Sequence, residues 1–153
     1  RNRPIFAIKP GASGDISLGK DETSNKWIQW CQKLAGPYNP STLIYDNRLV
    51  VLYDFGFLAS FNPTDGAEIT PKKRIPQGKA FTSSPWGYAG KVFCLNEDGV
   101  TFVIDSTDGL EILYKNKLAD DDMAMATPAF AGDRLLIRTS ARIYCIQNEI
   151  GQD

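Results

Sequence analysis

Length, composition and charge are those of a single globular domain. The 153 residues are 42% hydrophobic and 23% charged, and 17 basic residues stand against 18 acidic ones for a net charge of −1. Such a chain has no long-range field that favours nucleic acid or an anionic membrane, so neither is expected as a partner. No stretch approaches the roughly 18–20 continuous apolar residues of a membrane helix, so no membrane span is expected. One domain over 1–153 is the expectation.

Histidine and cysteine usage excludes several classes of enzyme. The chain has no histidine, so it holds neither a Ser-His-Asp or Cys-His triad nor a zinc site that contains histidine. Its three cysteines, Cys31, Cys94 and Cys145, are odd in number and show no CxxC spacing, so no zinc ribbon or disulfide framework is indicated. Cys94 and Cys145 lie in strand-like runs, where a free cysteine is typically a small buried hydrophobe rather than a reactive thiol.

A repeat of 43 residues organises the chain. Ser41, Ser84 and Thr127 follow one another at that spacing, and each opens a short apolar run. The Asp65-Gly66 dipeptide recurs as Asp108-Gly109 at the same separation, which shrinks to 42 residues in the last copy. A one-residue deletion in a hairpin turn explains the change. A fixed period of about 20–50 residues is typical of solenoids and propellers.

The first predicted element, in chain order, is half a copy over 3–31. Residues 3–8 match the third strand of the later copies, and the tryptophan-containing segment 25–31 is predicted as an outer strand. The next copy, over 41–70, is complete, with four short strands rich in Val, Leu, Phe and Tyr. Its turns contain Gly, Asn and Pro, which favour hairpins. No window sustains the apolar spacing of an amphipathic helix.

The third copy, over 84–114, repeats the four strands, and the fourth, over 127–147, has only three of them. Four antiparallel strands every 40 to 45 residues or so is the blade of a β-propeller. The sequence therefore predicts an all-β, partial β-propeller: half a blade, two whole blades and one blade without its outer strand. Propellers typically close with about 4–8 blades, so we expect the remaining blades of a longer chain, or another protein chain, to cover the open edges.

The third copy also carries a family pattern, in four segments: Ser84-Pro85, Gly90-Lys91-Val92-Phe93, Glu97-Asp98-Gly99-Val100 and Ile104-Asp105-Ser106-Thr107-Asp108-Gly109. These segments resemble the repeat of the PQQ-binding-like, or quinoprotein-type, β-propellers. The chain is most similar to bacterial propeller proteins that carry Ile-Lys-Pro-Gly, here 8–11, and Pro-Tyr-x-Pro-Ser, here 37–41. The resemblance implies the C-terminal blades of such a propeller, in an exported or envelope-associated bacterial protein.

The resemblance leaves two classes of function open, because this repeat serves dehydrogenases, outer-membrane assembly lipoproteins and sensor domains alike. The favoured hypothesis is a non-catalytic binding scaffold without catalytic residues, cofactor or metal. The alternative is a fragment of a quinoprotein oxidoreductase that uses PQQ and calcium. Such an enzyme needs a calcium held by Asp, Glu and Asn oxygens, a catalytic Asp and commonly a disulfide between adjacent cysteines. The chain has no adjacent cysteines.

An acidic cluster is the sharpest polar feature. Asp120-Asp121-Asp122 precedes the last copy, and propeller topology places it on the same face as Asp54, Glu97 and Asp98. One interpretation is a site for a divalent cation or a basic ligand, since calcium prefers carboxylate oxygens. The other is a solvated charged loop. Four basic residues on the same face would dilute the field, namely Lys72, Lys73, Arg74 and Lys79.

An aromatic and amide group flanks the first strands of two blades: Tyr38, Asn39, Phe81 and Trp86. It is interpreted either as a channel rim that binds a peptide or small ligand, or as packing within and between blades. Trp86, at the start of a strand, is expected to be packed. Met123 and Met125 are expected to fill gaps in the core.

Loop length predicts which face would bind a ligand. The connections 31–40, 71–83 and 115–126 are long and, in a propeller, share a face with the turns between second and third strands. The opposite face has only tight turns. Binding residues concentrate on long loops of a rigid scaffold, so a small ligand at the channel rim is expected near seven residues: Tyr38, Asn39, Asp54, Phe81, Glu97, Asp98 and Asp122.

Overall fold

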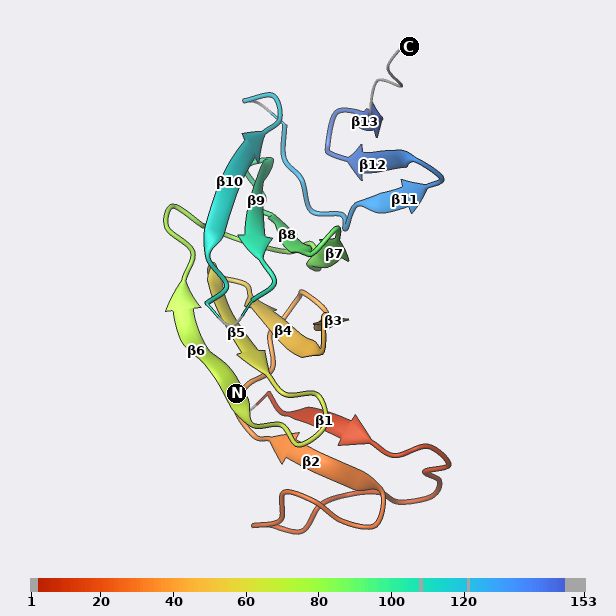
Figure 1. The fold of residues 1–153 in the computed structure, drawn as a ribbon. Helices are drawn as coiled ribbons and strands as arrows, with labels where there is room; N and C mark the ends of the chain where they lie inside the picture. Colours follow the sequence, from red (N-terminus) through yellow and green to blue (C-terminus); the bar gives the residue numbers. More distant parts are fainter. Residues whose placement is uncertain (1–2, 108, 121, 148–153) are drawn as a thin grey trace.

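The structure is a computed structural model that describes residues 3–107, 109–120 and 122–147. Within these ranges it holds thirteen strands in four separate antiparallel sheets and no helix. Figure 1 shows the sheets one after another along a curved arc, from the N-terminal pair to the C-terminal three strands. The prediction of an all-β, partial propeller with half a blade, two whole blades and a three-stranded blade is confirmed.

The first two sheets contain six strands. The first sheet pairs β1 (Ile5–Ile8) with β2 (Ile28–Gln32). The second has the order β3 (Leu43–Tyr45), β4 (Arg48–Tyr53), β5 (Phe57–Phe61) and β6 (Glu68–Arg74). The outer strand β6 continues four residues past the predicted end at 70. Much of an outer strand is exposed to solvent, so its side chains are polar and the sequence signal for a strand is weak there. The strand itself is maintained by its hydrogen bonds to β5.

The other two sheets contain seven strands. The third has the order β7 (Trp86–Tyr88), β8 (Lys91–Leu95), β9 (Val100–Asp105) and β10 (Ile112–Lys117). The fourth has the order β11 (Ala129–Ala131), β12 (Arg134–Arg138) and β13 (Ile143–Gln147). The inner strands β3, β7 and β11 lie along one side of the arc (Figure 1). Their hairpins use residues of positive φ, Asp46 and Asn47 (50° and 57°) and Ala89 and Gly90 (48° and 71°), as type I′ turns require.

The core consists of three apolar clusters, one between each pair of neighbouring sheets. Successive residues of a strand point to opposite faces, so β4 serves two clusters at once. Leu49 and Val51 pack toward the first sheet, and Val50 and Leu52 pack toward the third. The second and third sheets are therefore buried on both faces, which explains the nearly continuous apolar runs of their middle strands.

The cysteines divide between core and surface. Cys31 and Cys94 are buried, and burial raises the pKa of the Cys94 thiol well above its ordinary value. Cys145 is exposed, so the expectation that it is buried was wrong. Its neighbour Tyr144 packs toward the third sheet, and the alternation along β13 therefore turns Cys145 to the opposite face, which no other sheet covers within the described residues.

Different residues at equivalent positions of the outer strands hold neighbouring blades together. In the first sheet the Trp30 ring lies against the β5–β6 turn, where a methyl group on Gly66 would come within 2.7 Å of it. Trp30 Nε1 donates a hydrogen bond to the carbonyl of Pro63 at 3.0 Å. Lys73 follows Trp30 by 43 residues. Its ammonium donates to the carbonyl of Gly109 and pairs with Glu111 at 3.1 Å.

Hydroxyl side chains link the starts of the inner strands with the same period. The amide of Ser41 donates to Ser84 Oγ at 2.8 Å, and the amide of Ser84 donates to Thr127 Oγ1 at 2.9 Å. Both bonds join residues that are 43 positions apart. The repeated Ser or Thr therefore has a structural purpose, since each one orients the strand of the preceding blade.

Candidate functional site

The seven predicted site residues surround two adjoining pockets on one face of the molecule. The Tyr38 pocket, of about 370 Å³, is lined by Arg3, Tyr38, Asn39, Asp54, Phe55, Ala80, Phe81 and Glu97. The Asp122 pocket, of about 500 Å³, is lined by Lys79, Glu97, Asp98, Val100, Lys117, Asp120, Asp122 and Met123. Glu97 lines both pockets, so the structure brings all seven residues together.

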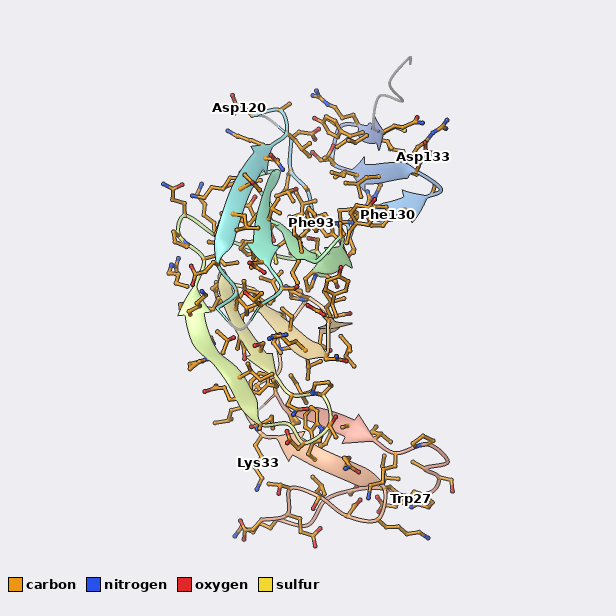
Figure 2. The ribbon with its side chains drawn as sticks, viewed as in Figure 1. Trp27, Lys33, Phe93, Asp120, Phe130 and Asp133 are labelled. Carbon is orange, nitrogen blue, oxygen red and sulfur yellow. The ribbon has the colours of Figure 1, made fainter. Side chains whose placement is uncertain are left out.

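Backbone hydrogen bonds create this shared face. The connection that enters the third sheet folds over the β4–β5 turn, where the amide of Phe81 donates to the carbonyl of Asp54 at 2.8 Å. One repeat later the amide of Ala124 donates to the carbonyl of Glu97 at 3.1 Å. Figure 2 shows the separation of the two faces: Lys33 and Asp120, in two connections, lie to the left of the view, and Asp133, in a tight turn, lies to the right.

Asp54 holds the segment that carries Tyr38 and Asn39. Its two carboxylate oxygens accept hydrogen bonds from the amides of Tyr38 and Asn39 at 2.8 and 2.9 Å. The Tyr38 side chain is 61% exposed, and the Arg3 guanidinium lies 4.4 Å from the centre of its ring. Asp54 is thus a positioning residue, and the two side chains that it presents are free to meet a ligand.

Phe81 forms the floor of the Tyr38 pocket and belongs to the core. It is 1% exposed, and its ring centre lies 5.9 Å from that of Phe102. Trp86 is also buried and stacks on Phe93 with 5.4 Å between ring centres, as expected for a packed residue. Within the aromatic group, therefore, only Tyr38 presents an exposed ring.

Glu97 and Asp98 form the β8–β9 turn and have partners in the connection before β7. Glu97 Oε1 accepts a hydrogen bond from the Thr82 hydroxyl at 2.5 Å. Asp98 Oδ2 forms an ion pair with Lys79 Nζ at 2.7 Å. An exposed pair of this kind contributes little to stability, but both contacts fix the connection over the turn. Glu97 thus has the role in the third sheet that Asp54 has in the second.

Asp122 is the most buried of the predicted carboxylates, at 3% exposure. Its carboxylate accepts four hydrogen bonds from the β12–β13 segment, at 2.6 to 3.2 Å, from the hydroxyls of Thr139, Ser140 and Tyr144 and the amide of Ala141. It also forms an ion pair with the guanidinium of Arg142 at 3.1 Å. Burial raises the pKa of this carboxyl, but the hydrogen bonds from Thr139, Ala141, Tyr144 and Ser140 outweigh burial and hold the pKa below its ordinary value.

Asp120 and Asp122, the two members of the acidic run that the structure describes, do not share a cluster of carboxylates. Asp120 is exposed and pairs with Lys117, which lowers the pKa of the Asp120 carboxyl. Asp121 lies outside the described residues. The expectation that Met123 and Met125 fill gaps in the core was wrong, because they are 48% and 46% exposed. In this connection Asp122 and Ala124 are the buried residues, and the methionines between and beside them point outward.

We expect Asp122→Asn to destabilise the chain at neutral pH, because the substitution removes a charge that four hydrogen bonds and an ion pair stabilise. The folded-state pKa is lowered, so the contribution is fully present above the ordinary aspartate value of about 3.9 and is lost as the pH falls below it. Urea unfolding at pH 7 and at about pH 3 measures this difference. The difference in the free energy of unfolding between the natural chain and the variant should be smaller at the lower pH. Asp120→Asn is the exposed control, and an equal loss in both variants would contradict the assigned role.

The described acidic and cysteine side chains do not come together as a metal site. Within 3–107, 109–120 and 122–147 no three Cys, Asp or Glu side chains are placed to share a metal ion. The carboxylates of Asp54 and Asp122 accept hydrogen bonds from neighbouring loops.

Sequence reasoning missed Phe55 and Arg3, which also line the Tyr38 pocket. Phe55 stands in the tip of the β4–β5 turn and is 75% exposed. The signal was present in the sequence, since a phenylalanine between Asp54 and Gly56 is a large apolar residue in the middle of a hairpin turn. Arg3 comes from the start of the chain, and its place beside Tyr38 depends on the packing of the first two sheets.

Comparison with known proteins shows the fold. No protein-family model and no curated protein sequence matches the chain. Among solved structures it is similar to BamB from Moraxella catarrhalis, with 16% identity and a TM-score of 0.62, over 79% of this chain and 37% of that one. The chain has a partial β-propeller fold. The resemblance expected from the repeat pattern is thereby confirmed at the level of fold.

Two quinohemoprotein alcohol dehydrogenases share this propeller fold. The enzyme ADHIIG from Pseudomonas putida HK5 aligns with 14% identity and a TM-score of 0.55, over 69% of this chain and 17% of its own. The enzyme from Comamonas testosteroni aligns with 12% identity and a TM-score of 0.53, over 69% of this chain and 18% of its own. The segment thus spans well under half the length of each solved chain. Its described residues contain no helix that is long and apolar enough to cross a membrane.

Proposed function

We propose that this propeller segment is a non-catalytic binding module, which presents the face of its connections to a ligand at the Tyr38 pocket. The observation that carries the proposal is that the carboxylates on this face hold loops in place. Asp54, Glu97 and Asp98 each hold a loop through a hydrogen bond or ion pair. They build a rigid frame that leaves Tyr38 and Asn39 exposed beside a pocket of about 370 Å³. A concave site with a few polar groups on a fixed scaffold is typical of ligand binding.

The same proposal includes further blades as packing partners. Ile5 and Ala7 of β1 pack toward the second sheet, whereas Phe6 and Ile8 point away from it and are 43% and 55% exposed. The outward residues line an apolar groove of about 550 Å³ on the first sheet. Each interface inside the segment joins two apolar sheet faces, so another propeller blade, of a longer chain or of another protein, is the occupant that matches this groove.

A fragment screen by NMR tests the ligand site. The probe is a library of small, water-soluble aromatic and polar compounds, added to the isotope-labelled chain while amide shifts are recorded. Bound compounds should shift the amide signals of Tyr38, Asn39 and Ala80. The Tyr38→Ala substitution should abolish these shifts, whereas Ile44→Ser, at an exposed position of β3, should leave them unchanged. Hits confined to the tight turns at Ala89 and Gly132 would contradict the proposed face. Sustained dye reduction after addition of PQQ and calcium would contradict the non-catalytic role.

A further inference from the structure

Exposed apolar side chains continue from the Tyr38 pocket across the neighbouring surface. Leu34, Tyr38 and Phe55 are 73%, 61% and 75% exposed. Phe55 lines both the Tyr38 pocket and an adjoining pocket of about 220 Å³ that Leu34, Tyr53, Phe57 and Lys72 also line. We call the following set the Phe55 patch: Arg3, Leu34, Tyr38, Phe55, Phe57 and Lys72. Exposed aromatic and arginine side chains around shallow pockets are typical of the centres of protein interfaces.

The backbone beneath the patch is fixed. Gly56 has a φ of 75°, and its amide donates to the carbonyl of Tyr53 at 2.9 Å. A methyl group on Gly56 would lie 3.0 Å from the backbone of Gly78, so the turn is clamped under the connection that follows β6. The amide of Ile75 donates to the carbonyl of Gly56 at 2.9 Å. Phe55 is therefore presented outward by a turn that has little freedom to fold it back.

Three cations lie over these rings; Arg74 is 5.0 Å from the centre of the Phe57 ring, and the other two are Arg3 and Lys72. Arg3 lies 4.4 Å from the centre of the Tyr38 ring, and Lys72 lies 3.8 Å and 5.2 Å from the ring centres of Tyr53 and Phe57. In the part of the chain that the structure describes, neither Arg3 nor Lys72 forms an ion pair with a carboxylate. The carboxylate of Asp54, which lines both pockets, accepts two backbone amides instead. Arg3 and Lys72 therefore outnumber the Asp54 carboxylate, and the patch, with excess positive charge beside apolar surface, complements an acidic, apolar partner.

The patch also lies outside the surfaces that blades use to pack together. The three apolar clusters of the segment are formed between sheet faces. The patch is built instead from the β4–β5 turn with the first residue of β5, the connection after β2, the outer strand β6 and Arg3 before β1. Another blade placed against a sheet face would follow the same packing, so the Phe55 patch needs a partner of a different kind.

We propose that the Phe55 patch binds an acidic peptide segment of another protein. An aromatic or branched aliphatic side chain of that segment packs beside Phe55, and flanking carboxylates pair with Arg3 and Lys72. This inference rests on the proposed function, because it assigns a partner class to the same face. It adds that recognition is by opposite charge around an apolar anchor, and that the recognised element is a short peptide rather than a folded blade.

A displayed library of random 12-residue peptides tests the inference, with the natural chain as bait and the Phe55→Ser, Lys72→Glu double variant for counter-selection. Enriched peptides should carry Asp or Glu on both sides of an aromatic or aliphatic residue. In fluorescence anisotropy a synthetic copy should lose at least about tenfold in affinity with Phe55→Ser or with Lys72→Glu. Replacing its acids with lysine should have a similar effect. Far-ultraviolet circular dichroism confirms that each variant is folded.

Matched control variants distinguish binding at the Phe55 patch from non-specific electrostatic or hydrophobic binding elsewhere on the chain. Lys26→Glu changes another lysine that lies over an aromatic ring, 4.5 Å from the centre of the Trp27 ring, and Ile44→Ser changes an exposed apolar residue of β3. Both variants should bind as the natural chain does. Enriched peptides that are basic, but still require Phe55, would overturn the partner class and leave the proposed binding face standing. No enrichment, or peptides insensitive to the double variant, would overturn the peptide site, and the fragment screen then decides the proposed function alone.

Discussion

Replacing Trp30 with alanine is expected to lower the free energy of unfolding by about 3–5 kcal/mol. The side chain is 8% exposed, its ring covers Gly66, and its indole N–H bonds the carbonyl of Pro63 at 3.0 Å. Alanine would leave a cavity between the first two sheets and an unpaired carbonyl at its edge. Urea unfolding followed by circular dichroism measures the loss.

The damage should be local to one interface, because blades in a repeat array contact only their neighbours. Amide hydrogen exchange should accelerate in β1 and β2 and stay unchanged in β8 and β9. Trp27→Ala is the matched control, since Trp27 is half-buried and lies under the exposed Lys26. An equal loss from both tryptophans, or faster exchange throughout the chain, would contradict the assignment of Trp30 as the lock between the first two blades.

Phe102→Ala is expected to cost a similar amount, about 3–5 kcal/mol, but with effects on both complete blades. Phe102 is 1% exposed in the cluster between the second and third sheets, and it supports Phe81 under the Tyr38 pocket. The variant should therefore unfold at lower urea and also lose fragment binding at Tyr38. Phe130→Ala, which removes an aromatic that is 49% exposed and stacks on Tyr88, should cost about 0.5–1.5 kcal/mol and leave the pocket intact. Equal costs for the two phenylalanines would contradict the placement of the core.

The fold was predictable because the repeat fixes turns as well as strands. Gly56 and Gly99 are 43 residues apart and have φ of 75° and 73°, so the period marks the hairpins directly. Which sheet packs on each face of a blade was harder to predict from the sequence. Alternation in a strand shows that Tyr144 and Cys145 point to opposite faces, but only the stacking of sheets shows which face is covered. The contact between the second and third sheets was equally hard to predict. Lys73 occupies the position equivalent to Trp30, but it makes the contact between sheets by hydrogen bonding instead of by packing a ring.

The face of the candidate site was also predictable, because propeller topology gathers the connections and the turns between second and third strands. The roles of its residues were not. Asp122 receives its donors from residues 139–144, which strand patterning cannot pair with it. The sequence shows a large apolar residue, Phe55, inside the turn between Asp54 and Gly56, but the turn alone does not show that this side chain lines a pocket. Its exposure depends on the close approach of Gly78 beneath the turn.

Hydrogen–deuterium exchange on the chain, with and without the selected acidic peptide, tests the central claim most directly. That claim is that a rigid propeller segment binds its partner through the face of the connections. We predict slower exchange in residues 33–40, 53–57 and 72–74, with the hairpin at Ala89 and Gly90 unchanged. Protection confined to that hairpin or to the groove of the first sheet, with the Phe55 patch unaffected, would contradict the account.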